Sequence, residues 1–192
     1  MCPAESALRL ATYQDLLALP EAVRAEVVAG QIVTAPSPLP EHSWAAGALA
    51  QIVGGPFGHG AGPGGWWILA EVDVQLGEHD VVRPDYAGWR RERLPEPWGV
   101  RPLTVVPDWV CEILSPSNAD YDRAAKADLY AAKGVQHYWL VDPQSRVLEA
   151  YVLTDGRWLR LGAWGRDAVV RVPPFDEVEL NVGRLFPPGL GS

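Results

Sequence analysis

Apolar and polar positions along the chain follow two periods, a period of two that is typical of strands and a longer one that is typical of helices. Strand-like runs occupy residues 25–28, 31–35, 66–77, 80–89, 108–114, 136–143 and 147–165, the last folded around Asp155-Gly156. Helix-like segments occupy residues 13–19, 41–53 and 115–134. Between 41 and 142 the predicted order is therefore helix, strand, strand, strand, helix, strand.

Local signals set the ends of the predicted helices. Thr12 is a residue type that favours the N-cap position and directly precedes the first helix. Gly54-Gly55 is expected to end the second helix in a left-handed conformation, and Gly134 is expected to end the third. Either Ser117 or Asn118 is expected to cap the third helix at its start.

This order of elements predicts a mixed sheet. A chain that alternated strand and helix throughout would form a doubly wound parallel sheet, whereas here antiparallel turns precede a single helical crossover. We therefore expect an α/β (α+β) fold with an αβββαβ core. A single domain is expected over 1–192, with its core at about 41–143, an N-terminal helix and hairpin in 1–40, and a C-terminal hairpin and tail in 144–192.

The composition narrows the classes of function. The chain has 192 residues and a formal net charge of −8, which argues against a protein that holds nucleic acid by bulk charge. Two cysteines are too few for a disulfide scaffold or a four-cysteine zinc site. No apolar run is long enough to span a membrane and no signal-peptide pattern is present, so we expect a cytoplasmic protein without membrane contact.

Glu112 is the most informative candidate for chemistry. In the strand predicted over 108–114, every residue after Asp108 is apolar except Glu112. Trp109, Cys111 and Ile113 are expected on one face of the strand, and Glu112 on the other. A buried carboxylate needs a metal ion, a nearby cation or a raised pKa. The alternative is an edge strand that leaves Glu112 in solvent.

A second carboxylate, Asp85, lies in the preceding β run directly after Pro84. Proline interrupts strand pairing, so an aspartate at this point can project toward a cleft. A Pro-Asp dipeptide is also common in ordinary turns, so this signal is weak by itself.

Only two of the 16 basic residues are lysines, and this scarcity draws attention to both of them. Lys126 and Lys133 share one face of the third predicted helix with Tyr130. Arginine is planar and permanently charged, whereas lysine is a compact cation whose pKa shifts readily, so a retained lysine can mark a chemical requirement. Asp122 lies four residues before Lys126, and a simple ion pair on the helix is the alternative role.

Together these segments resemble a known family. The matching segments are Glu26 to Gly30, Pro40-Glu41-His42, Arg83-Pro84-Asp85, Cys111 to Ser117, Lys126 with Tyr130, and Gly134 to Pro143. They are similar to the pattern of a widespread bacterial family of "putative restriction endonucleases" in the PD-(D/E)XK nuclease-like superfamily. The resemblance covers residues 12 to 155 and is most specific from 108 to 143. It implies a restriction-endonuclease-like mixed sheet.

The resemblance also implies roles for individual residues. Asp85 and Glu112 are expected to bind the metal ion, with the backbone carbonyl of Ile113 as a further ligand. Mg²⁺ is the expected ion and Mn²⁺ the alternative. The superfamily pattern has a lysine two positions after the glutamate, but here that position is Leu114. Lys126 is the expected substitute, which would orient or deprotonate the attacking water or stabilise charge on phosphorus.

Four further residues are weaker candidates for the same site: Glu26, Tyr130, Glu71 and Asp73. Glu26 is suggested by the resemblance, and Tyr130 by its place on the helix face of Lys126. Glu71 and Asp73, in the preceding strand run, are the weakest of the four.

The function that these features favour is a Mg²⁺-dependent endonuclease that hydrolyses DNA phosphodiester bonds. Four arginines close to Asp85 in sequence are the expected DNA-binding residues: Arg83, Arg90, Arg91 and Arg93. A local basic rim of this kind can bind phosphates although the whole chain is acidic. A solvated loop is the alternative for 90–93.

Two other functions stay open at this point. A catalytically inactive, homodimeric interaction or assembly protein would explain the missing strand lysine and the acidic charge, and the nine Trp residues could supply its interface. A metal-dependent hydrolase of another phosphate ester is the third hypothesis. Geometry separates them, because catalysis requires Asp85, Glu112 and Lys126 to converge within about 4–6 Å in one pocket.

Overall fold

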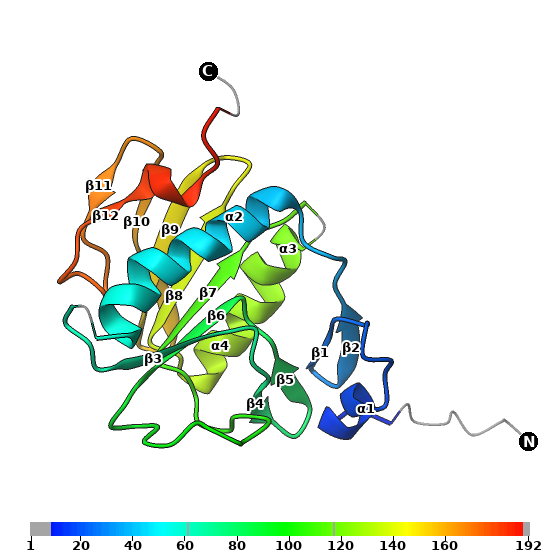
Figure 1. The fold of residues 1–192 in the computed structure, drawn as a ribbon. Helices are drawn as coiled ribbons and strands as arrows, with labels where there is room; N and C mark the ends of the chain where they lie inside the picture. The colour runs from blue at the N-terminus through cyan, green and yellow to red at the C-terminus, as the bar shows by residue number, and fades with distance from the viewer. Residues whose placement is uncertain (1–8, 61, 117, 190–192) are drawn as a thin grey trace, which may run out of the picture.

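The computed structural model describes residues 9–60, 62–116 and 118–189, and it is built on a six-stranded mixed sheet (Figure 1). The sheet has the order β10-β9-β8-β7-β6-β3 and consists of β3 (Trp66–Ala70), β6 (Tyr86–Arg90), β7 (Trp109–Ile113), β8 (His137–Asp142), β9 (Val147–Thr154) and β10 (Arg157–Gly165). Only β7 and β8 pair in parallel, across the helical crossover, and the other neighbours pair antiparallel. The predicted mixed α+β fold is confirmed.

A smaller sheet packs beside the first and carries the N-terminal hairpin. Its order is β2-β1-β5-β4, formed by β1 (Ala25–Val28), β2 (Gln31–Thr34), β4 (Val74–Gly77) and β5 (Asp80–Val82). The predicted hairpin around Gly30 is confirmed, and Gly30 adopts a φ of +74° in its turn. The first helix, α1 (Tyr13–Leu17), begins after Thr12 as predicted, where Thr12 and Asp15 form a capping box.

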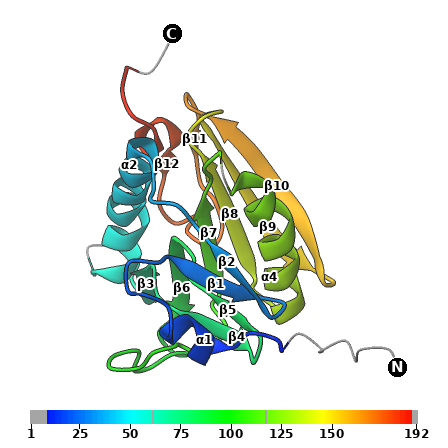
Figure 2. The same cartoon turned by 90° about the vertical axis from the view of Figure 1, so that its right-hand side faces the viewer.

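Helices cover both faces of the six-stranded sheet (Figure 2). On one face lies α2 (Pro40–Leu49), which continues as a π-helical segment, η1 (Ala50–Gly58). On the other face lies the crossover helix, built from α3 (Ala119–Tyr121), a π-helical turn η2 (Asp122–Lys126) and α4 (Ala127–Lys133). The C-terminal segment forms β11 (Val169–Val170), β12 (Leu180–Asn181) and a 3₁₀ turn, η3 (Val182–Leu185), that packs on α2.

Strand β7 lies inside the sheet, and its alternation is as predicted. Trp109, Cys111 and Ile113 are buried in the core under α2. Val110 belongs to the second core, under α4, and Glu112 points to that same side. Only 3% of Glu112 is exposed, so the alternative of a solvent-facing edge strand is excluded.

Two predicted strand runs are wrong in their boundaries. The runs 66–77 and 80–89 each divide between the two sheets, so that β3 and β6 join the large sheet while β4 and β5 join the small one. The chain turns at Glu71, which adopts a φ of +51°, and again at Pro84, which has no amide hydrogen for a ladder. The αβββαβ core is therefore α2, β3, β6, β7, the crossover helix and β8, with β4–β5 inserted into the smaller sheet.

The second helix also ends later than predicted. The expected stop at Gly54-Gly55 does not occur, because the helix widens into η1 and runs through Pro56 to Gly58. The wider π-helical winding changes the hydrogen-bond register, and the amide of His59 donates to the carbonyls of Gly54 and Gly55. Gly134 does end α4 in a left-handed conformation, whereas Ser117 lies outside the described residues.

Other local predictions hold. Asp155 and Gly156 have φ of +49° and +73°, as a tight β9–β10 hairpin turn requires. The C-terminal tail contains the two short strands β11 and β12. No helix within the described parts of the chain is long and apolar enough to cross a membrane.

A pair of glycine substitutions tests the helix ends. Gly134 has a φ of +82° with open space around it, so Gly134→Ala introduces backbone strain without a clash. We expect a loss of about 1 kcal/mol in the free energy of unfolding, measured by urea denaturation. Gly47→Ala is the matched control, because Gly47 lies within α2 with equally open space, and there alanine should stabilise by about 0.5–1 kcal/mol. Equal effects at both positions would contradict the assignment of Gly134 as the helix stop.

Candidate active site

Asp85 lies between β5 and β6, at the point where the chain passes from the small sheet to the large one. Its carboxylate is buried and held on both sides. Oδ2 accepts a hydrogen bond of 2.7 Å from the backbone amide of Ile113, and Oδ1 lies 3.0 Å from Nε2 of His42. The position of Asp85 is thus fixed by strand β7 and by the first turn of α2.

Glu112 is adjacent to Asp85 and links it to the crossover helix. Oε2 of Glu112 accepts a hydrogen bond of 3.3 Å from the amide of Asp85. Oε1 is 2.6 Å from Nζ of Lys126 and accepts a hydrogen bond, also 2.6 Å, from the hydroxyl of Tyr130. One oxygen of the carboxylate is therefore held by both an ammonium group and a hydroxyl, and the other by a backbone amide.

Lys126 lies beneath these carboxylates, with only 4% of its side chain exposed. Besides Glu112, its ammonium contacts Oε1 of Glu26 at 3.0 Å and Oδ1 of Asp122 at 3.7 Å. Glu26 reaches the site from β1 and also accepts a hydrogen bond of 2.6 Å from the amide of Arg83. The ammonium therefore has three carboxylate neighbours, which suits its three hydrogens.

Electrostatics in this cluster favour a charged lysine among carboxyl groups that resist ionisation. Burial lowers the pKa of Lys126, but the three carboxylates outweigh it and hold that pKa well above its ordinary value. Burial raises the pKa of Glu112 well above its usual range, against the opposing effect of Lys126. Burial raises the pKa of Asp122 to about 7. Lys126 opposes this rise, and the carboxylates of Asp85 and Glu26 reinforce it. Oδ2 of Asp122 is buried without a partner in the described part of the chain, which fits a carboxyl that retains a proton.

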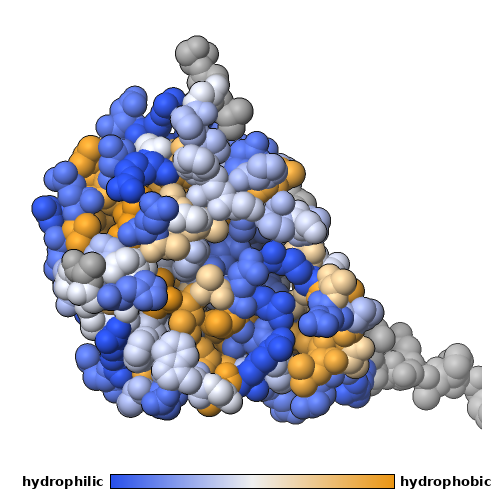
Figure 3. Space-filling model, viewed as in Figure 1, coloured by the Kyte–Doolittle hydropathy of each residue, from blue (hydrophilic) through white to orange (hydrophobic). Residues whose placement is uncertain are grey.

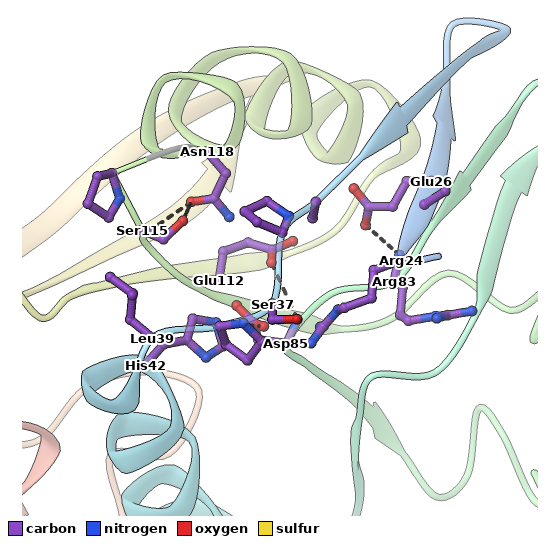
Figure 4. Close-up of a pocket in the computed structure, with 15 residues that line it drawn as sticks. Arg24, Glu26, Ser37, Leu39, His42, Arg83, Asp85, Glu112, Ser115 and Asn118 are labelled. Atoms are coloured by element: carbon purple, nitrogen blue, oxygen red, sulfur yellow. Dashed lines mark hydrogen bonds and ion pairs between the residues drawn. The ribbon is translucent and has the colours of Figure 1, made fainter. Parts of the chain in front are cut away.

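A pocket of about 310 Å³ opens beside the two carboxylates (Figure 4). Asp85, Glu112 and Glu26 reach it from three separate segments of the chain, and His42 stands next to Asp85. Figure 3 shows the corresponding area as a recessed, mostly hydrophilic region on the face between α2 and the β1–β2 hairpin. The pocket, which we call the carboxylate pocket, is lined by Glu26, His42, Arg83, Asp85, Glu112 and Asn118, among others.

The structure thus brings together five of the residues that the sequence singled out: Asp85, Glu112, Lys126, Glu26 and Tyr130. His42 was not singled out as a site residue, although it is part of the Pro-Glu-His segment at the start of α2. Its spacing from Asp85 in sequence gives no sign of contact, and only the packing of α2 against β7 places the two side by side.

Glu71 and Asp73 lie outside this pocket. Asp73 is clamped by Arg83 and Arg101, each at 2.7 Å, and accepts a hydrogen bond from Tyr13. Glu71 pairs with Arg24 at 2.8 Å near the surface. β3 ends at Ala70, Glu71 adopts a φ of +51° and β4 begins only at Val74, so neither residue lies in a strand that borders the pocket.

The four arginines expected to bind DNA all have partners within the chain. The guanidinium of Arg83 binds Asp73, and that of Arg93 lies 2.5 Å from Asp108. Arg90 and Arg91 stack over the rings of Trp66 and Trp67, and Arg91 also donates to the carbonyls of Trp66 and Gly58. Their contacts fix the loop after β6, and only Arg83 borders the carboxylate pocket.

The donor set fits a hard divalent cation. Asp85 and Glu112 present carboxylate oxygens to one pocket, and Mg²⁺ commonly binds through one or two carboxylates while it keeps several waters. No three His, Cys, Asp or Glu side chains within the described ranges are grouped as a metal site, so the fit rests on two carboxylates. The Ile113 amide faces Asp85, and the role expected for the Ile113 carbonyl stays a prediction.

Comparisons with known proteins agree with this architecture. A family model, Uma2, described as "Putative restriction endonuclease", matches residues 10–183. A crystal structure of a "putative nuclease" from Anabaena variabilis superposes with a TM-score of 0.69 at 24% sequence identity, covering 91% of this chain and 96% of that chain. At this identity the likeness concerns the fold. No curated protein shows a significant match.

Proposed function

The chain belongs to the Uma2 family of "putative restriction endonucleases", and from this membership and the converging carboxylates we propose that it is a divalent-metal-dependent nuclease that hydrolyses DNA phosphodiester bonds. One observation carries the proposal: Glu112 contacts both Asp85 and Lys126, although the three residues are far apart in sequence. Buried acidic groups with shifted pKa values beside a pocket are typical of catalytic sites.

We propose that Asp85 and Glu112 hold Mg²⁺ or Mn²⁺, with the Ile113 carbonyl as a further ligand. When bound, such a cation neutralises the phosphate and makes a water molecule more acidic. The amide of Ile113 and the ring of His42 hold the Asp85 carboxylate, while Lys126 and Tyr130 hold that of Glu112. Burial raises the pKa of Tyr130, so its hydroxyl keeps the proton that it donates.

Lys126 takes the place of the missing strand lysine in a modified role. Its raised pKa keeps it protonated, so it does not remove a proton from water. We propose that its ammonium orients the side chains of Glu112 and Glu26 at the pocket. Leu114, at the usual lysine position, is buried in the core under α4 instead.

Metal-dependent cleavage is the direct test. Supercoiled plasmid and single-stranded DNA should be cleaved with Mg²⁺ or Mn²⁺ and left intact in EDTA. Asp85→Asn should lower the cleavage rate at least about 100-fold, because it removes a cation ligand without changing shape. Glu96→Gln, an exposed carboxylate in the loop after β6, is the control for the same change of charge.

Two outcomes would contradict the proposal. Cleavage that survives Asp85→Asn would point to a contaminating nuclease, and the absence of cleavage under every condition would favour an inactive assembly protein with a nuclease fold. Size-exclusion chromatography with light scattering would then test the predicted homodimer, which the single chain leaves as a prediction.

A further inference from the structure

A second groove lies on the far side of α2 from the carboxylate pocket. It has a volume of about 550 Å³ and runs between α2 and the C-terminal segment around η3. We call it the α2–η3 groove, and it is lined chiefly by Ser43, Trp44, Gln51, Arg166, Arg184 and Phe186. Figures 1 and 2 both show the C-terminal segment lying along α2, so the two walls of the groove are neighbours.

The charge of this groove differs from that of the rest of the molecule. Its described lining contains two arginines and no acidic residue, in a chain whose net charge is −8. Arg166 and Arg184 are exposed. Within the described part of the chain, neither guanidinium forms an ion pair or hydrogen bond, in contrast to Arg83 and Arg93. Two unpaired guanidinium groups are therefore available for an anion.

The groove is also built rigidly. The amide of Val182 donates to the carbonyl of Ala168, and the side chain of Asn181 accepts from the amide of Gly183. A Cβ atom at Gly183 would lie 2.7 Å from the carbonyl oxygen of Arg166, so only glycine permits this close approach. These contacts hold the two arginine-bearing segments together.

The first turn of α2 lies between the carboxylate pocket and the α2–η3 groove. A hollow of about 390 Å³ adjoins the carboxylate pocket and shares Leu39, His42, Ser115 and Pro116 with it. His42 is followed directly by Ser43 and Trp44, which line the α2–η3 groove. A DNA strand that crosses the first turn of α2 would therefore pass from the carboxylate pocket to the arginines of the groove.

From these observations we infer that the α2–η3 groove binds the phosphate backbone of the DNA substrate on one side of the scissile bond, through Arg166 and Arg184. The inference rests on the proposed function and names its binding surface. Trp44 is 48% exposed and is oriented by a hydrogen bond of 3.3 Å from its indole to the carbonyl of Arg184. It offers an aromatic edge for contact with the sugar or base beside these phosphates.

The test is the salt dependence of DNA binding. Fluorescence anisotropy with a labelled duplex in EDTA should give an affinity that falls linearly with salt on logarithmic scales. The double variant Arg166→Gln/Arg184→Gln should bind about tenfold more weakly at low salt, with a slope reduced by about 1.8, because each lost phosphate contact removes about 0.9. The control is Arg157→Gln/Arg160→Gln, which removes two exposed charges from β10 and should leave the slope unchanged.

The results separate this inference from the proposed function. Equal loss of slope in both double variants would show an effect of bulk charge, and no loss in either would show that the groove is not used; both overturn the inference. If the wild-type protein cleaves DNA and the groove variant binds and cleaves equally well, only the inference fails. If no cleavage occurs but the groove variant alone loses the slope, the inference stands and the proposed catalysis fails.

Discussion

Lys126→Met is expected to reduce the free energy of unfolding by about 3–5 kcal/mol at pH 8, because it leaves buried carboxylates without their cation. Lys126 is the group that opposes burial at both Glu112 and Asp122, whose pKa values are already raised. Without it, both pKa values rise further in the folded state. Urea unfolding at several pH values, with cleavage measured in parallel, checks this expectation.

The pH dependence has a definite sign. A carboxyl group whose pKa is higher in the folded than in the unfolded state costs stability once the pH exceeds the unfolded value. The deficit of Lys126→Met should therefore be small near pH 5 and grow toward pH 8. Lys133→Met is the matched control, because Lys133 pairs with Asp80 at 2.8 Å with 29% of its side chain exposed. That variant should lose less than about 1 kcal/mol. A deficit in Lys126→Met that is independent of pH would contradict the electrostatic role.

The part of the site that was predictable from sequence depends on strict periodicity. Alternation along the strand 109–114 gives the facing of Glu112, and helical spacing gives Lys126 and Tyr130 a common face. Those rules apply to β7 because it is a regular buried strand, and to Lys126 and Tyr130 because the α-helical segment α4 begins directly after Lys126, although a π-helical turn precedes it. The parallel pairing of β7 with β8 then brings the helix face back over Glu112.

The rest of the site depends on backbone turns and helix packing, which the order of apolar and polar residues does not predict. The left-handed turn at Glu71 and the break at Pro84 divide two apparent strands between two sheets, and so move Asp73 away from Asp85. His42 reaches Asp85 only through the packing of α2.

The sequence also failed to predict which surface arginines have a free charge. Closeness to Asp85 in sequence suggested Arg90 and Arg93, yet their side chains turn to Trp66 and Asp108. Arg166 and Arg184 lie about 80 to 100 positions further along the chain and remain unpaired among the described residues. Sequence position does not fix the direction of a long side chain, and its partner decides whether its charge is available.

Glu112→Gln is expected to lose cleavage activity without losing stability, whereas Lys126→Met is expected to lose stability. The amide keeps the shape of the side chain but is a poor ligand for a hard cation, so cleavage should fall at least about 1,000-fold. Titration with Mn²⁺ alone should show weaker binding, which gives a readout besides activity. Lys126 still contacts Glu26 and Asp122, so no buried charge is left unpaired.

Stability should not fall in this variant. Burial raises the pKa of Glu112, so its ionisation in the folded state costs free energy as the pH rises above the unfolded value near 4.5. Replacing it by a neutral residue removes that cost and relieves repulsion among the carboxylates around one ammonium group. We therefore expect Glu112→Gln to be at least as stable as the wild-type protein at pH 8, and to restore part of the stability lost in Lys126→Met when the two are combined. A Glu112→Gln protein that is markedly less stable at pH 8 would show that Glu112 acts as a structural partner of Lys126, and it would remove the argument that this carboxylate is retained for catalysis.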